Sequence, residues 1–364
     1  MGLVGGFGGA LLQIGLAFER ALARSTRYVL YTILKGSGAL GLSVVLVVVM
    51  RKGALGLVAG NAIPAALLGI FLYWRLLARY SARFVRRILT AAIDFGGPLV
   101  PMNLAMWALS YSDIYLLRRL VAGGKALSEV GLYQYAHEIC LVLVLPVTAL
   151  NLAWPQFIFA NYRRPGSREM FAKVEVYFAL AMIEVAMLLS IFSDHVIRFV
   201  GSIQYGGSAG VIPWLGGSLV FYGLSIVFAS GLYLSGRTKI LGIVVAACAG
   251  LNILLNIWLI PSLGKTGAAI ATLMTDFVLA SVVLGFARRS YEIPFKVART
   301  GLAIGVAACA VIVSRVVFGS MELSNAMVRG GIAVGVTLVL PKLLGTTWGE
   351  IAGLWRTFKP SSRG

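Results

Sequence analysis

Long apolar segments recur along almost the whole 364-residue chain, and they constrain its fold more than any other feature. A membrane-spanning helix needs about 20 mostly apolar residues. Eleven segments approach that length: roughly 2–18, 28–50, 54–74, 95–117, 128–153, 174–197, 212–234, 239–260, 266–286, 300–317 and 326–344. Only 12% of the residues are charged, against about 25% in an average soluble protein. The sequence therefore predicts an all-α polytopic membrane bundle of about 11 transmembrane helices.

The distribution of basic residues predicts the orientation of these helices. The net charge is +19. One set of alternate connections, together with the C-terminal segment, carries 22 Lys and Arg residues, and the other set carries nine. Cytoplasmic connections hold the excess of Lys and Arg in membrane proteins, so we expect the first set and the C-terminus to be cytoplasmic. Because the basic residues alternate with spans, they form no continuous nucleic-acid-binding surface.

The segment 251–272, LNILLNIWLIPSLGKTGAAIAT, predicts a helical hairpin. Two apolar runs flank a short break that contains Pro261 and Gly264, the residues that most often punctuate turns. Asn252 and Asn256 are four residues apart, so they share one face of the first helix. Polar side chains on one face of an apolar helix indicate contact with other helices rather than with lipid.

A weaker version of the same hairpin occurs near the start of the chain. A shift of 211 residues places Gly53 and Gly56 on Gly264 and Gly267, with an apolar span before and after each pair. The two copies are separated by an even number of spans, so we expect repeats that run parallel through the membrane.

The repeat also leads to an expectation about length. The spans at 95–117, 128–153 and 174–197 have no counterparts 211 residues upstream. We therefore expect an amino-terminally shortened version of a protein with about three more helices, or roughly 14 in all. The alternative is that the repeat is accidental and the protein has eleven spans.

Several short motifs lie at the ends of spans: FGGPLVP at 95–101, SDIYLL at 112–117, GLY at 131–133, NLAWP at 151–155, IP at 260–261 and GAA at 267–269. In this pattern the chain resembles the polysaccharide-exporter branch of the multidrug/oligosaccharidyl-lipid/polysaccharide flippase superfamily. It is similar to O-antigen and exopolysaccharide flippases. The resemblance covers nearly the whole chain, but it is distributed and includes no single catalytic signature.

The resemblance implies a fold and a function. Members have two six-helix lobes around a central cavity, so residues 1–90 would be the remainder of the first lobe. Residues 91–290 would be the second lobe, and residues 291–364 two trailing helices and a basic cytoplasmic tail. Members move undecaprenyl-diphosphate-linked oligosaccharide across the bacterial cytoplasmic membrane by alternating access. The implied partners are this lipid-linked oligosaccharide, the bilayer, a coupling proton or sodium ion, and glycan polymerases and glycosyltransferases.

Ionisable side chains inside spans are candidate functional groups, because they are costly in a bilayer. Lys35 could bind the substrate diphosphate, or its ammonium could extend to the cytoplasmic face. Glu138, Glu184 and Asp276 could each bind a coupling ion, or each could pair with a neighbour inside the bundle.

Asp113 precedes two arginines at the outer end of its span. That spacing favours an interfacial ion pair with Arg118 or Arg119, a contact that contributes little to stability.

Amides and aromatic rings are candidates for sugar binding. Sugar hydroxyls form hydrogen bonds with amides, and sugar rings stack on aromatic faces. Asn103, Asn151, Asn252, Asn256 and Trp154 could line a substrate cavity. The alternatives are contact with the next helix for the asparagines and an interfacial position for the tryptophan.

Enzyme, cofactor and metal sites are not expected. The GKT at 264–266 resembles the end of a phosphate-binding loop, but Leu259 stands where that loop requires glycine. His137 and His195 have no second ligand at metal-binding spacing. The glycine-rich segment 5–9 favours close helix packing.

Two other functions compete with the flippase. A drug or organic-cation antiporter of the same superfamily would use acidic rather than basic cavity residues. A membrane-embedded glycosyltransferase or polymerase would normally have a large extramembrane loop, which this chain lacks.

Overall fold

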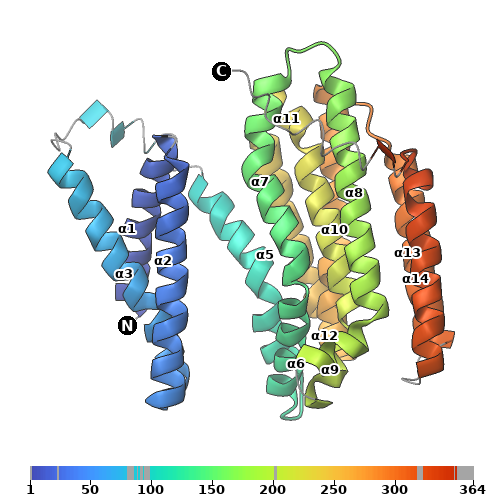
Figure 1. The fold of residues 1–364 in the computed structure, drawn as a ribbon, viewed down its shortest axis with the longest axis horizontal. Helices are drawn as coiled ribbons and strands as arrows, with labels where there is room; N and C mark the ends of the chain where they lie inside the picture. The colour runs from blue at the N-terminus through green and yellow to red at the C-terminus, as the bar shows by residue number, and fades with distance from the viewer. Residues whose placement is uncertain are drawn as a thin grey trace. The chain divides into compact units, whose positions relative to one another are not determined.

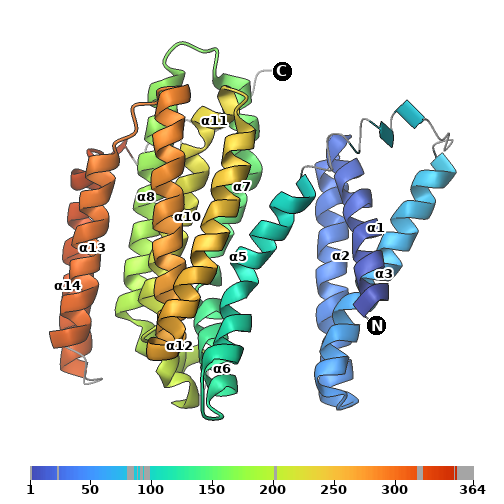
Figure 2. The same cartoon turned by 180° about the vertical axis from the view of Figure 1, so that it is seen from behind.

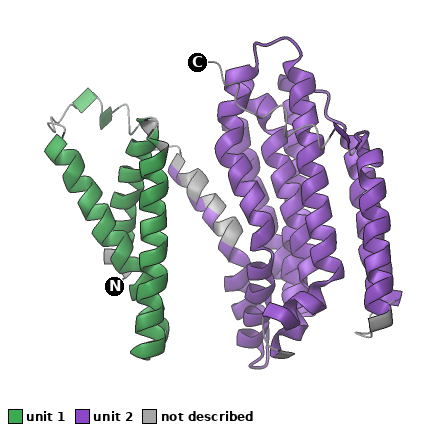
Figure 3. Cartoon of the chain, in the orientation of Figure 1, with its two compact units in different colours: residues 1–93 green, residues 94–364 purple. Residues whose placement is uncertain are grey.

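The computed structural model of the protein describes residues 2–22, 24–79, 86–87, 89–90, 93, 99–200, 203–317, 323–347 and 349–350. All regular structure in these ranges is helical, which confirms the predicted all-α class. The chain divides into two compact units, residues 1–93 and residues 94–364 (Figure 3).

The first unit contains α1 (Gly2–Ala21), α2 (Ser25–Val44), its π-helical extension η1 (Val45–Val49) and α3 (Gly53–Arg79). The second unit contains α5 (Leu99–Leu120), α6 (Ala126–Ile139), α7 (Leu141–Asn161), α8 (Ser167–Ile191), α9 (Ser193–Val200), the 3₁₀ turn η2 (Ile203–Ser208), α10 (Ile212–Phe228), α11 (Ser230–Leu234), α12 (Thr238–Ser290), α13 (Val297–Val317) and α14 (Leu323–Leu344) (Figure 1).

Eight helical segments in the described ranges are long and apolar enough to cross a membrane: Thr26–Val49, Gly53–Arg79, Leu141–Asn161, Ser167–Ile191, Ile212–Leu234, Thr238–Ser290, Val297–Val317 and Asn325–Leu344. The segment Thr238–Ser290 contains two of the predicted spans, 239–260 and 266–286. Helix α1 covers the predicted span 2–18, and α5 covers the predicted span 95–117 from residue 99 onward. The protein is therefore a multi-pass membrane protein.

The predicted single span at 128–153 differs from the structure. The helix breaks at Cys140, and α7 continues to Asn161, eight residues past the predicted end. Ile158, in the added part, is fully buried in the core of the second unit. Packing of this residue explains why the helix extends beyond the apolar segment.

Helix α12 is a hairpin. Gly264 has φ 55° and ψ −133°, a conformation that residues with a Cβ rarely adopt. A Cβ on Gly267 would lie 2.5 Å from the carbonyl oxygen of Leu259, whereas eight residues of continuous helix span about 12 Å. The chain therefore reverses at Gly264, which confirms the predicted hairpin. We call residues 238–263 the first arm and residues 265–290 the second arm (Figure 2).

The same backbone pattern occurs in the first unit. Gly53, 211 residues before Gly264, has φ 53° and begins α3. The end of α3 at Arg79 corresponds under the same shift to the end of α12 at Ser290. In addition, α1 packs against α3 as α10 packs against α12. The helix boundaries and the turn conformation thus support the repeat predicted from the glycines.

The glycine-rich start of α1 lies close to α3, as predicted. A Cβ on Gly8 would lie 2.4 Å from the Cα of Ala66, and a Cβ on Gly69 would lie 2.5 Å from the carbonyl oxygen of Gly8. Small residues of this kind allow helix backbones to approach closely in membranes.

Helix α8 forms the centre of the second unit, where it packs against α10, α13 and α14. Its side chains Phe171, Met182 and Ile191 are at most 1% exposed. A second buried cluster lies where α5, α6 and α12 meet, and it includes Leu117 and Ala268. The candidate functional site lies in this second cluster.

Candidate functional site

The carboxylate of Asp113 is buried where α5, α6 and α12 meet, and the residue is 3% exposed. Tyr133 Oη and Thr272 Oγ1 each donate a hydrogen bond of 2.6 Å to Oδ2. Asn256 Nδ2 donates a hydrogen bond of 2.6 Å to Oδ1. Because hydrogen bonds to a charged group each contribute about 1.5–3 kcal/mol, these donors offset part of the cost of a carboxylate inside a membrane protein.

The two asparagines of the first arm extend this network. Asn252 and Asn256 are both fully buried, and Asn256 Nδ2 also donates to Asn252 Oδ1 over 3.0 Å. Ser112 Oγ of α5 donates to the same oxygen over 2.7 Å. The predicted shared face is confirmed, and it faces α5 rather than lipid.

The hairpin brings the polar residues of its two arms together. Asn256 and Thr272 are each eight residues from Gly264, and Asn252 and Asp276 are each twelve residues from it. Thr272 and Asp276 are one turn apart, so they lie on one face of the second arm. Asp276 is 6% exposed, and it accepts a hydrogen bond from Ser218 of α10.

The network around Asp113 has the composition of a site for a small cation. Within the described residues, Asp113 forms no ion pair, and Asn252 Nδ2 and Asn256 Oδ1 are buried without a hydrogen-bond partner. A half-turn of the Asn256 amide exchanges its oxygen and nitrogen. Carboxylate, amide and hydroxyl oxygens are the ligands of hard cations. The cluster could therefore hold a monovalent cation, or Asp113 could bind a proton.

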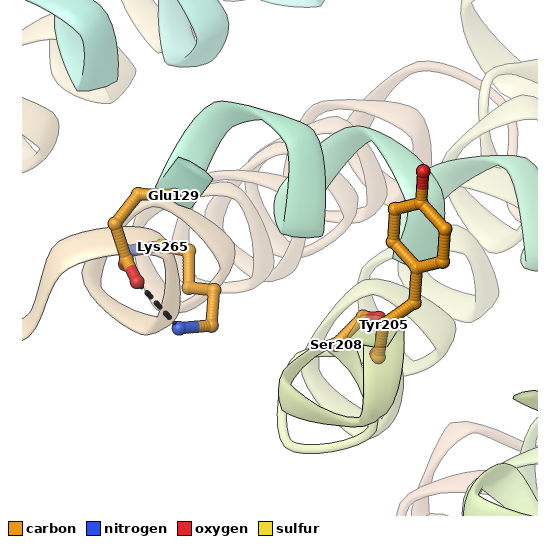
Figure 4. Close-up of polar contacts among 4 residues, drawn as sticks. All are labelled: Glu129, Tyr205, Ser208 and Lys265. Atoms are coloured by element: carbon orange, nitrogen blue, oxygen red, sulfur yellow. Dashed lines mark hydrogen bonds and ion pairs between the residues drawn. The ribbon is translucent and has the colours of Figure 1, made fainter. Parts of the chain in front are cut away.

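An ion pair links α6 to the hairpin turn close to this network (Figure 4). Lys265 Nζ lies 2.7 Å from Glu129 Oε1, and the backbone N–H of Lys265 donates to Glu129 Oε2 over 2.9 Å. A Cβ on Gly264 would lie 2.5 Å from Glu129 Oε2, so glycine makes room for the carboxylate. Glu129 lies one helical turn before Tyr133, which donates a hydrogen bond to Asp113. The contact between Glu129 and Lys265 therefore holds the hairpin turn against α6, the helix that carries Tyr133.

Two predicted ion-coupling residues lie outside the network. Glu138 is exposed on α6, and its Oε1 accepts a hydrogen bond of 2.9 Å from Gln134 Nε2. Glu184 of α8 accepts a hydrogen bond from Thr337 of α14, and its Oε2 is buried without a hydrogen-bond partner in the described structure. Of the three predicted acids, Asp276 alone lies on the hairpin face that carries the network.

The predicted substrate-binding residues are dispersed. Lys35 is partly exposed on α2 in the first unit, and Asn151 is exposed on α7. The side chain of Asn103 lies outside the described residues. Asn252 and Asn256 belong to the polar network.

Trp154 packs inside the second unit rather than on an open surface. The residue is 2% exposed, and its indole N–H donates to Ser230 Oγ over 2.8 Å. Its ring lies 5.6 Å from the ring of Phe157 and 5.8 Å from that of Phe171, measured between centroids. In this structure, protein side chains cover the ring.

The expected interfacial ion pair of Asp113 is wrong. Asp113 is buried, and it is bonded to Tyr133, Asn256 and Thr272 instead of Arg118 or Arg119. Its place near the end of a span suggested exposure, but α6 and α12 cover that part of α5. The equal spacing of polar residues on both sides of Gly264 was a sequence signal for the part of the network that lies on the hairpin, but it did not point to Asp113.

Comparison with known proteins gives matches in structure and none in sequence families. No protein-family model matches the chain. No curated protein matches it.

Solved structures with a similar fold are membrane transporters. The lipid II flippase MurJ, in an inward closed conformation, matches 94% of this chain and 72% of its own, with a TM-score of 0.67 and 14% sequence identity. A point mutant of a MATE protein matches 77% of this chain and 65% of its own, with a TM-score of 0.54 and 17% identity. The structure of MATE in complex with MaL6 matches 77% of this chain and 66% of its own, with a TM-score of 0.56 and 16% sequence identity.

MurJ and the MATE transporters both belong to the superfamily that the sequence resembles. Identities of 14–17% establish the fold alone, because one fold can carry several functions. The chain therefore has the polytopic helical transporter fold of the lipid II flippase MurJ and the MATE proteins.

Proposed function

We propose that the protein is a cation-coupled flippase for undecaprenyl-diphosphate-linked oligosaccharide in the bacterial cytoplasmic membrane, with its C-terminus in the cytoplasm. Its role would be in the synthesis or export of a polysaccharide. The similarity of the fold to a lipid II flippase supports a lipid-linked substrate. The motifs at span ends, including NLAWP at 151–155, support the polysaccharide-exporter branch.

The buried carboxylate of Asp113 is the observation that carries the coupling. A carboxylate surrounded by neutral donors and without an ion pair in the described structure is stabilised by a cation of its own. Tyr133 and Thr272 supply further oxygens from α6 and α12. Asn256 supplies another after a half-turn of its amide, because its nitrogen faces Asp113 in this structure. Transporters of sodium and protons hold their ions in sites of this kind near interrupted helices. We assign Asn252 and Asn256 to this ion site rather than to sugar binding.

The geometry suggests how a bound cation would act on the fold. A cation at Asp113 attracts oxygens from α5, α6 and both arms of α12 to one point. It therefore favours the conformation in which these helices are close together. A ligand shifts a conformational equilibrium only by its difference in affinity for the two states, and a site shared by three helices supplies that difference when the helices move.

Three further residues are proposed for the substrate. Lys35 would bind the diphosphate, because an ammonium group is a compact charge with three donors. Asn151 is exposed on α7 and could bind sugar hydroxyls. Asn103 is also proposed for sugar binding, because its side-chain amide can form hydrogen bonds with sugar hydroxyls.

Transport in proteoliposomes tests the proposal. The substrate would be a fluorescent undecaprenyl-diphosphate oligosaccharide, and a membrane-impermeant reductant would report which leaflet holds it. We expect a sodium or proton gradient to accelerate translocation, and Asp113→Asn to remove that acceleration. Glu138→Gln should retain it, because Glu138 lies outside the network. Gradient-driven transport that survives Asp113→Asn but is lost in Glu138→Gln would contradict the assignment.

The second candidate is a drug or organic-cation antiporter, and the similarity to MATE structures favours it. The same vesicles distinguish the two functions. Gradient-driven uptake of ethidium in the absence of any movement of the lipid-linked glycan would support the antiporter and reject the flippase.

A further inference from the structure

A cavity of about 220 Å³ lies in the second unit between α8, α10, α13 and the second arm of α12. Met187 and Leu273 contribute apolar walls to it. It opens toward the surface of the unit, because Trp214 and Ile312 line it and are 37% and 60% exposed. An apolar cavity that opens at the surface of a bundle of membrane-spanning helices could admit a hydrocarbon chain.

One charged residue follows the cavity-lining residues along α13. Ile304, Ala308 and Val311 line it from α13, and Arg315 continues their spacing on the same helix face. Arg315 is partly exposed. Helix α13 therefore carries the apolar cavity-lining residues and the guanidinium of Arg315 on one continuous stripe.

The contacts of Arg315 join α13 to residues that are close in sequence to the cavity-lining residues of α8 and α10. Its Nη1 donates to the carbonyl oxygen of Ala209 over 2.7 Å and to Ser193 Oγ over 3.3 Å. Ser193 is one turn from Ser190, which lines the cavity. In the described part of the chain, both hydrogen bonds of Arg315 use Nη1, which leaves the Nε and Nη2 donors for another acceptor.

A second arginine lies close to Arg315. Arg329 of α14 is 1% exposed and lies 3.6 Å from Asp194 of α9. Arg315 is adjacent to this pair through Ser193. The guanidinium groups of Arg315 and Arg329 thus each contact one of two consecutive residues, Ser193 and Asp194, at the start of α9.

We propose that this cavity binds a phospholipid with an anionic head group. One acyl chain occupies the apolar cavity, and the phosphate accepts hydrogen bonds from Nε and Nη2 of Arg315, a geometry that suits arginine. By the expected orientation, the lipid comes from the outer leaflet. It fills the space between α13 and the helices α8 and α10. This inference is independent of the transported substrate.

Native mass spectrometry of the purified full chain tests the site. The chain would be titrated in detergent with dioleoylphosphatidylglycerol and, separately, with dioleoylphosphatidylcholine. We expect tighter binding of the anionic lipid, and Arg315→Gln should weaken that binding about tenfold, through the lost charge-assisted hydrogen bonds. Arg198→Gln is the matched control, because Arg198 is an exposed arginine on α9. Ala308→Phe should weaken both lipids by filling the cavity.

Three results would overturn the proposal. Equal loss in Arg315→Gln and Arg198→Gln would indicate attraction by overall charge. If Ala308→Phe binds both lipids as tightly as the unmodified protein does, the acyl chain lies outside the cavity. Displacement of phosphatidylglycerol by an equimolar polyprenyl diphosphate would identify the occupant as a polyprenyl lipid. If Arg315→Gln does not fold, Arg315→Lys replaces it, with an intermediate affinity expected because the charge is retained without the planar donor pair.

Discussion

Tyr133 and Thr272 donate hydrogen bonds to the same atom, Oδ2 of Asp113, each over 2.6 Å. The first residue lies on α6 and the second on α12, so one carboxylate oxygen connects two helices to α5. Removing either donor should leave the fold largely intact while it weakens the site.

Thr272→Val should weaken cation binding by about tenfold, because a hydrogen bond to a charged group contributes about 1.5–3 kcal/mol. The measurement is the shift in thermal unfolding temperature as sodium is titrated into the detergent-solubilised protein. Thr275→Val is the matched control, because Thr275 is a buried threonine on the same arm whose hydroxyl bonds to the carbonyl of Ala271. The same sodium response in both variants would argue against a cation at Asp113.

Gly264→Ala should destabilise the hairpin by about 1–3 kcal/mol, the range for a residue forced into a rarely populated backbone conformation. Its new Cβ would also lie 2.5 Å from Glu129 Oε2. Gly285→Ala is the control, because Gly285 lies inside the second arm, where a Cβ would have no neighbouring atom within 4 Å. Unfolding temperatures in micelles would be compared, and equal values for the two variants would contradict the strained turn.

Glu129→Ala should have a larger effect than Glu129→Gln. Both variants lose the ion pair with Lys265, which contributes about 1 kcal/mol or less, but glutamine retains an oxygen for the backbone N–H of that residue. Hydrogen exchange at the turn should therefore increase more in the alanine variant. Glu169→Gln, at an exposed position on α8, should not change exchange there.

Trp154→Phe should lower stability by about 1 kcal/mol, since the indole N–H and its hydrogen bond to Ser230 are lost. Trp107→Phe should have little effect on stability, because Trp107 is 63% exposed. Thermal unfolding is measured first, and transport of the lipid-linked glycan second. A Trp154→Phe variant with unchanged stability and reduced transport would instead favour direct contact with sugar.

The sequence predicted the features that depend on local chemistry. Apolar length identified the spans, and Pro261 with Gly264 identified the reversal between the two arms. Both signals are contained in short continuous segments of the sequence, so neither requires knowledge of the packing of distant helices. The repeat was predicted from glycine positions, and its turn glycines have nearly equal φ values, 53° and 55°.

The candidate site depended on contacts that are distant in sequence. Asp113 meets Asn256 and Thr272 from more than 140 residues away, and no local pattern specifies that approach. The position of Trp154 was missed for a similar reason, because its burial depends on α8 and α11. A composition typical of a sugar site, amides with aromatic rings, is equally typical of polar contacts between membrane helices.

The two hairpins have the same turn but differ in the polarity of their arms. Under the shift of 211 residues, the positions of Asn252, Asn256 and Asp276 correspond to Gly41, Val45 and Ala65 in the first unit. The described hairpin of that unit has the same turn but no amide or carboxylate at these three places. In the described residues, the buried amides and the carboxylate at these positions therefore belong to the hairpin of the second unit, so the two hairpins share a backbone shape but differ in polarity.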